Sequence, residues 1–231
     1  MKDRIAAWRI AKLHAYLEYV SRTSVVAVKG DFDSRQVLAM WHENIYLALV
    51  ACHSIKGVAV YVWKHPQAAF SAALIRSCGM HVIEGSEENL YGRRTVTAWL
   101  SGAADRKLVV AVDGPWGPRR VAKRGALLFA GLAGVSLRAL TFSAVGVHRL
   151  PTWDDRCVPE SGLRMTMSNE SEILLGTCDA RHDLERVLRL QSLTSSPQLS
   201  ARALAGRCWV RACAGPHFFG RATFPGISQP E

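Results

Sequence analysis

Four short segments carry side chains that can bind a ligand or transfer a proton, and each follows an apolar run typical of a buried strand. They are Trp41-His42-Glu43, Lys64-His65-Pro66, Glu84-Gly85-Ser86 and the stretch from Asp113 to Arg120. In an open α/β sheet, ligands bind outside the carboxyl ends of the strands, where residues of this kind collect. These segments are therefore the candidate functional positions of the chain.

The segment Asp113-Gly114-Pro115-Trp116-Gly117-Pro118-Arg119-Arg120 is the most specific of them. Its repeated Gly-Pro step restricts the backbone to a rigid, compact loop that neither extends a strand nor starts a helix. Backbone N–H groups and paired cations in such a loop are suited to hold a phosphate or a phosphopantetheine arm. The alternative is a tight turn whose basic residues are simply solvated.

His42 is the candidate general base. A neutral imidazole at a strand end, with a helix beginning directly behind it, can accept a proton from a substrate hydroxyl. The alternative is a core histidine whose hydrogen bonds are satisfied within the fold. We predict that His42 and Asp113 face one cleft at the same edge of the sheet.

The elements that must position these residues alternate along the chain. Strands are expected at residues 24–28, 37–41, 58–63, 80–83, 108–112 and 136–145. Helices are expected at residues 3–21, 43–54, 67–78, 90–101, 123–133 and 179–193. Such alternation predicts an α/β fold with a central mixed, largely parallel sheet flanked by helices.

Composition is that of a globular protein, with 49% hydrophobic and 21% charged residues, which excludes global disorder. The net charge of +10 suits an anionic partner, namely nucleic acid, a phosphate-bearing substrate or an acidic membrane surface. A solubilising surface is the alternative. The six cysteines form no Cys-x-x-Cys pair, so we expect no metal site and reduced thiols in a cytosolic compartment.

We divide the chain into an amphipathic N-terminal helix (residues 1–22), an α/β domain (23–175) and a helix plus a weakly ordered basic tail (176–231). Residues 186–230 contain six arginines and no acid. The longest nearly apolar run, residues 125–137, would be about 20 Å long as a helix, short of the roughly 30 Å hydrocarbon core of a bilayer. We therefore expect a protein that does not span a membrane.

Taken in order, these segments resemble the lysophospholipid acyltransferase superfamily, and in particular its bacterial branch long catalogued as a domain of unknown function. That branch has a Trp-His after its first core strand, a Gly-Ser step, an Asp-Gly-Pro-x-Gly-Pro loop and a later Trp-Asp ahead of a proline. The matching residues here are Trp41-His42, Gly85-Ser86, Asp113 to Pro118, and Trp153-Asp154 with Pro159. The resemblance covers about residues 35–170.

The resemblance implies a glycerolipid acyltransferase-like fold. It also implies transfer of a fatty acyl group from an acyl thioester (acyl-CoA or acyl carrier protein) to a lysophospholipid-like acceptor, without a cofactor. His42 would be the general base, with Asp113 as a second catalytic residue. The implied substrate-binding residues are Trp41, Gly85, Ser86, Arg93, Arg94, Gly114, Pro115, Gly117, Pro118, Arg119 and Arg120. The enzyme would lie in the cytoplasm, peripheral on the inner face of the membrane, with its basic surplus and first helix against anionic headgroups.

The chain departs from the family pattern at three places. Better-known members carry His-x-x-x-x-Asp, but the acid position is Leu47 here, and Asp113 is the candidate substitute through space. Glu84 stands where an arginine usually precedes Gly-Ser, and residues 63–67 replace a Ser-x-x-Asp-Gly-like stretch.

The sequence is also compatible with two other functions. One is a catalytically inactive relative that binds lipid or phosphate. The other is a nucleic-acid-binding protein that uses the basic tail, which we do not favour because no recognised nucleic-acid motif accompanies the charge.

Overall fold

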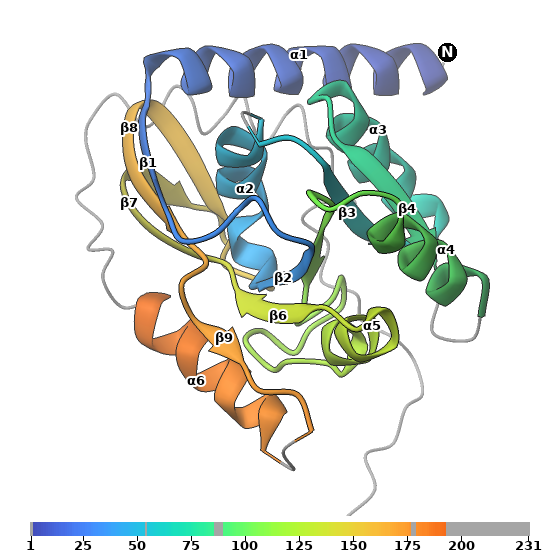
Figure 1. Cartoon of the computed structure of the whole chain (residues 1–231). Coiled ribbons are helices and arrows are strands. Elements are labelled where there is room, and N and C mark those ends of the chain that lie inside the picture. The colour runs from blue at the N-terminus through green and yellow to red at the C-terminus, as the bar shows by residue number, and fades with distance from the viewer. Residues whose placement is uncertain (1, 54, 86–89, 177–178, 193–231) are drawn as a thin grey trace, which may run out of the picture.

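The computed structural model describes residues 2–53, 55–85, 90–176 and 179–192. The predicted fold class is confirmed, because a mixed, largely parallel sheet lies between layers of helices (Figure 1). A second, smaller sheet packs beside it. The predicted basic tail lies outside the described residues from position 193 onward.

The larger sheet has six strands in the order β4-β3-β5-β2-β6-β9. All its pairs are parallel except β6 with β9, which is antiparallel. The strands are β2 (Gln36–Met40), β3 (Val58–Trp63), β4 (His81–Gly85), β5 (Lys107–Ala111), β6 (Ser136–Ala139) and β9 (Glu172–Ile173). Because β2 and β5 are central and parallel, the residues that follow them meet at one edge of the sheet.

Side chains of successive strand residues point to opposite faces, and each face buries its own core. On one face Leu38 and Met40 pack with α1 (Lys2–Thr23), α2 (Ile45–Cys52) and α3 (Ala69–Ser77). On the other face Val37 and Ala39 pack with α4 (Leu90–Ser101), α5 (Gly125–Ala133) and α6 (Ala180–Ser192). Strand β2 is therefore buried on both faces, as its unbroken apolar sequence predicts.

The smaller sheet has the order β1-β8-β7, built from β1 (Val25–Lys29), β7 (Thr141–Arg149) and β8 (Cys157–Ser168). Strands β7 and β8 form an antiparallel hairpin, and β1 is parallel to β8. The expectation of one strand over residues 136–145 was wrong, since β6 and β7 belong to different sheets. The chain changes sheet at Leu140, whose N–H donates to the carbonyl of Ala39 at 2.7 Å.

The expected helices correspond to observed ones, with two differences at their starts. The stretches expected at 43–54 and 67–78 begin with short 3-10 turns, His42–Asn44 and Pro66–Ala68. Helix α1 is bound to the rest of the fold by Leu13, Leu17 and Val20, which are buried. Among the described residues, no helix combines the length and the apolar character needed to cross a bilayer.

Candidate active site

His42 and Asp113 lie together at the carboxyl edge of the larger sheet. The backbone N–H of His42 donates to Oδ1 of Asp113 at 2.8 Å, and the N–H of Arg120 donates to Oδ2 at 3.1 Å. The Asp113 carboxylate is fully buried, and this burial raises its pKa despite both hydrogen bonds. It therefore fixes the loop from Asp113 to Arg120 against the end of β2, and its hydrogen bond with His42 is to the backbone N–H.

The carboxylate that contacts the His42 ring is that of Asp154, in the connection between β7 and β8. Nδ1 of His42 lies 2.7 Å from Oδ2 of Asp154. Thr152 donates its hydroxyl to Oδ1 at 2.6 Å, and Arg156 donates Nε–H to Oδ2 at 3.0 Å. Burial alone would raise the pKa of Asp154, but the hydrogen bond from His42 and the charge of Arg156 outweigh it and hold that pKa well below the usual range.

This pairing decides which ring nitrogen of His42 can act as a base. An ionised carboxylate only accepts hydrogen bonds, so Nδ1 carries the proton and Nε2 keeps a lone pair. The His42 side chain is 17% exposed, so that lone pair is not sealed in the core. The ring of Trp153 lies against the imidazole with a centroid distance of 5.3 Å, which further fixes its position.

A second buried carboxylate, Glu43, holds arginines from two other segments. It pairs with Arg119 at 2.6 Å, with Arg120 at 2.7 Å and with Arg149 at 3.7 Å. Asp155 completes the cluster, pairing with Arg119 at 3.1 Å and with Arg149 at 3.2 Å. Three guanidinium groups against two carboxylates leave one positive charge within this cluster, and the buried Asp113 carboxylate and the Asp154–Arg156 pair lie next to it. Arg119 and Arg120, expected to contact phosphate, are thus already ion-paired, although the cluster as a whole stays cationic.

The loop from Asp113 to Arg120 is compact, and two of its glycines explain why. Gly114 has φ +64° and Gly117 has φ +73°, conformations that other residues rarely adopt. A Cβ on Gly117 would lie 3.0 Å from the Trp153 ring. Pro115 and Pro118 are exposed on the loop's outer side. Gly117 therefore permits the close contact between this loop and the segment that carries Asp154.

Aromatic rings border the loop at the same edge. Trp63, at the end of β3, stacks on His65 with centroids 5.1 Å apart. Trp116 of the loop stands perpendicular to both rings, at 6.0 Å from Trp63 and 5.8 Å from His65. Strand β3 is two strands from β2, so this cluster lies about 10 Å from the end of β2. It occupies the position where the family pattern has a polar stretch.

Trp41 and Gly85, both expected to contact substrate, have structural surroundings. Trp41 is completely buried in the core between the larger sheet and α4 to α6. Gly85 ends β4, where a Cβ would lie 2.5 Å from the hydroxyl of Tyr61. Gly92 of α4 needs the same space, because its own Cβ would lie 3.0 Å from the Cα of Gly85. The glycine at position 85 thus allows α4 to approach the strand closely.

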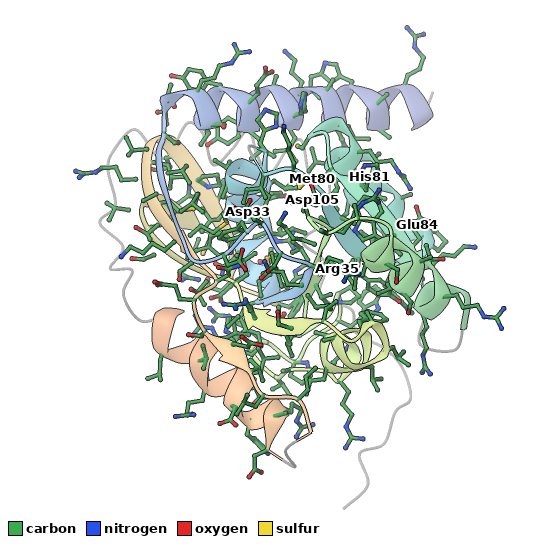
Figure 2. All side chains as sticks on the ribbon, viewed as in Figure 1. Asp33, Arg35, Met80, His81, Glu84 and Asp105 are labelled. Carbon is green, nitrogen blue, oxygen red and sulfur yellow. The ribbon has the colours of Figure 1, made fainter. Side chains whose placement is uncertain are left out.

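The remaining positions discussed from the sequence lie at the end of β4 and on α4. Glu84 is paired with Arg76 of α3 at 2.6 Å and lies on the outer part of the fold (Figure 2). Arg93 and Arg94 are exposed on α4. Ser86 lies outside the described residues.

A shallow depression lies at the opposite, amino-terminal edge of the sheet, where Asp31, Asp33 and Arg35 precede β2. Asp33 and Arg35 are labelled in Figure 2. This depression shares no residue with the site around His42. Within the described parts of the chain, no three His, Cys, Asp or Glu side chains are grouped as metal ligands would be.

Asp154, Arg156 and Arg149 are site residues for which the sequence alone predicts no role. Asp154 stood in the Trp-Asp step that the family resemblance includes, which was the available signal. Nothing in its local spacing links it to a histidine 112 residues earlier. The link exists only because the β7–β8 hairpin packs across the end of β2.

No family model matches the chain, and no curated protein matches it either. Among solved structures, the chain is similar to the 1-acyl-sn-glycerophosphate (LPA) acyltransferase PlsC from Thermotoga maritima. The TM-score is 0.46 and the sequence identity 13%, over 82% of this chain and 81% of that one.

Proposed function

We propose that the protein is an acyltransferase that moves a fatty acyl group from an acyl thioester to a hydroxyl of a lysophospholipid-like acceptor. The observation that carries this proposal is the contact of 2.7 Å between His42 Nδ1 and Asp154. It leaves Nε2 as a proton acceptor at the sheet edge where α/β proteins bind ligands. The family resemblance of the surrounding segments supplies the reaction class.

In the proposed reaction, Nε2 of His42 takes the proton of the acceptor hydroxyl as its oxygen attacks the thioester carbonyl carbon. Asp154 stabilises the resulting imidazolium through Nδ1. The C–S bond of the tetrahedral intermediate then breaks, and His42 returns the proton to the thiolate. The products are an ester and a free thiol. A thioester is already activated, so positioning, a base and charge stabilisation are what the protein must provide.

The positive charge left on the cluster of Glu43, Arg119, Arg120, Arg149 and Asp155 supports an anionic substrate group beside His42. The phosphate of a lysophospholipid, or the phosphopantetheine arm of the donor, has that charge. In this proposal Asp113 acts by fixing the loop, and Arg93 and Arg94 remain candidates for a more distant phosphate contact.

The proposed location is the cytoplasmic, inner face of a membrane, where the net charge of +10 favours anionic headgroups. The acyl donor, whether acyl-CoA or acyl carrier protein, is a substrate, and the proposed reaction uses no cofactor. An inactive relative that binds lipid or phosphate is favoured by Leu47, which stands where the usual acid would be, and by Glu84, which stands where an arginine usually is. The contact of Asp154 with His42 argues against the first reason, because it supplies a carboxylate to the ring from another segment.

The test is release of free thiol from acyl-CoA by the purified protein, with and without lysophospholipids, for the wild type and for His42→Ala. We expect release that depends on the acceptor and falls by about 10²- to 10⁴-fold in the variant, the usual contribution of a general base. His81→Ala is the matched control. His81, labelled in Figure 2, is the first residue of β4 and therefore lies at the amino-terminal edge of the sheet, opposite to the edge that carries His42. Full activity in His42→Ala would exclude the proposed mechanism. Lipid binding without thiol release in the wild type would favour the inactive relative.

A further inference from the structure

Helix α5 is apolar on every side, yet only one side of it is buried. Its sequence, Gly125–Ala133, contains no polar side chain. A helix of this kind is ordinarily buried all round. Phe129 and Ala130 do pack in the core, whereas Leu128 and Leu132, one turn apart, are 47% and 56% exposed. The outer face of α5 is therefore an apolar surface in contact with solvent.

This surface begins beside the candidate active site. Val121 and Trp116 are further exposed apolar side chains in the loop that leads to the helix. The N–H of Lys123 donates to the carbonyl of Val112 at 2.7 Å, which anchors the start of α5 next to Asp113. A partner that covered α5 would therefore also adjoin the edge of the sheet that carries His42.

Two cations, Lys123 and Arg124, stand at the start of α5. Of the six lysines and arginines between Asp113 and Asp154, the four others (Arg119, Arg120, Arg138 and Arg149) are ion-paired, and Glu185 of α6 accepts a hydrogen bond from the N–H of Ala122. Lys123 and Arg124 form no ion pair with the described residues, and Arg124 is exposed one turn before Leu128. Exposed leucines next to uncompensated cations match an anionic lipid surface. They do not suit a second copy of this chain, because a two-fold contact would place these cations against themselves.

We propose that the α5 stripe, made of Val121, Leu128 and Leu132 and flanked by Lys123 and Arg124, docks on anionic lipid headgroups. The inference rests on the proposed function in one respect, since a lysolipid acceptor would reach His42 from that bilayer. It differs from the sequence-based expectation that α1 holds the membrane. Figure 1 shows α1 and α5 well apart, and the start of α5 adjoins the loop that begins at Asp113.

The test is cosedimentation of the full chain with vesicles of phosphatidylcholine alone or mixed with phosphatidylglycerol, without donor or acceptor. We expect binding to the mixed vesicles and a loss of roughly tenfold or more for each of Leu128→Glu and Leu132→Glu. Arg124→Gln should weaken binding to the mixed vesicles only. Val145→Glu is the matched control, because Val145 is 66% exposed on β7 of the smaller sheet.

Trp8→Glu, on the exposed side of α1, tests the competing surface. Binding by both α5 variants at the wild-type level would overturn the proposal, as would an equal loss for Trp8→Glu. A dimeric wild type that becomes monomeric in Leu128→Glu would assign the stripe to a second copy and would also overturn it. The vesicle assay needs no turnover, so its outcome is independent of whether thiol release is observed.

Discussion

Replacement of Asp154 by asparagine tests the central contact of the site. In Asp154→Asn the side chain keeps its shape but loses its charge, so Nδ1 of His42 loses its ionised acceptor. The ring is then free to carry its proton on Nε2, where it cannot act as a base. Loss of the orienting acid in a comparable serine protease triad lowers kcat by about 10⁴-fold, so we expect a loss on the order of 10³- to 10⁴-fold here.

The same substitution has a cost in stability. Arg156 is buried, and its Nε and one terminal guanidinium nitrogen lie 3.0 Å and 2.9 Å from Oδ2 of Asp154. Breaking a buried pair by removing one charge costs about 3–5 kcal/mol, and we expect the lower end because Thr152 still bonds the amide. Urea unfolding measures this free energy, and thiol release under conditions where the variant is folded measures the activity.

The effect on stability also has a predicted dependence on pH. The pKa of Asp154 is depressed in the folded state, so its contribution is fully present above the pKa of an unfolded aspartate, about 3.9, and is lost as pH falls below that value. The stability difference between wild type and Asp154→Asn should therefore be constant from neutral pH down to about 4 and shrink below it.

Asp155→Asn is the matched control for this variant. Asp155 is partly exposed, its pairs with arginines at such a site contribute at most about 1 kcal/mol, and asparagine tolerates its positive φ of 50°. Asp155 pairs with arginines and not with the imidazole, and neutralising it makes the cluster more positive, so we expect this variant to keep wild-type activity within a few-fold. Wild-type activity in Asp154→Asn, or an equal loss in Asp155→Asn, would refute the role assigned to the His42–Asp154 contact.

Two further substitutions test the surroundings of the site. Gly117→Ala should destabilise the fold by about 2–3 kcal/mol in urea unfolding, because it combines an unfavourable φ with a Cβ 3.0 Å from the Trp153 ring. Gly79→Ala, which has a similar φ of +79° and no atom within 4 Å of its Cβ, should cost only about 1 kcal/mol, and equal costs would contradict the clash. Leu47→Asp, at the position of the usual acid in the family that the sequence resembles, should cost about 3 kcal/mol or more because Leu47 is buried in the core. It should also fail to restore thiol release when added to Asp154→Asn, and recovery would show that Leu47 faces the ring.

The sequence predicted the alternation of strands and helices well because hydrophobic periodicity is a local property. The run Val37 to Met40 is apolar on both faces, and it forms the central strand β2. Strand β8 was missed since Pro159 and Gly162 interrupt its pattern, and these residues usually mark turns. The expected strand 136–145 was too long because periodicity does not report that Leu140 carries the chain from one sheet to another.

The position of the site was predicted from the sequence, but the contacts within it were not. Residues after strand ends can be located from the sequence, which is why His42 and the loop from Asp113 were expected at one edge. Which carboxylate meets the imidazole depends on how the two sheets pack, and no local signal encodes that. Asp113 and Asp154 both lie near His42, and only the three-dimensional arrangement assigns the first to the backbone and the second to the ring.

His42 and Asp154 are 112 residues apart in the sequence, and this separation determines when activity can arise during synthesis. In a His-x-x-x-x-Asp arrangement the two side chains are only five residues apart and are synthesised almost together. Here a growing chain contains the imidazole long before its carboxylate, and the pair exists only once the β7–β8 hairpin has been made and docked. Unfinished chains and fragments that end before the hairpin are thus expected to spare cellular thioesters. In the finished protein, local opening of the smaller sheet would switch the base off while the larger sheet remained folded, and hydrogen exchange of the hairpin amides would measure how often that happens.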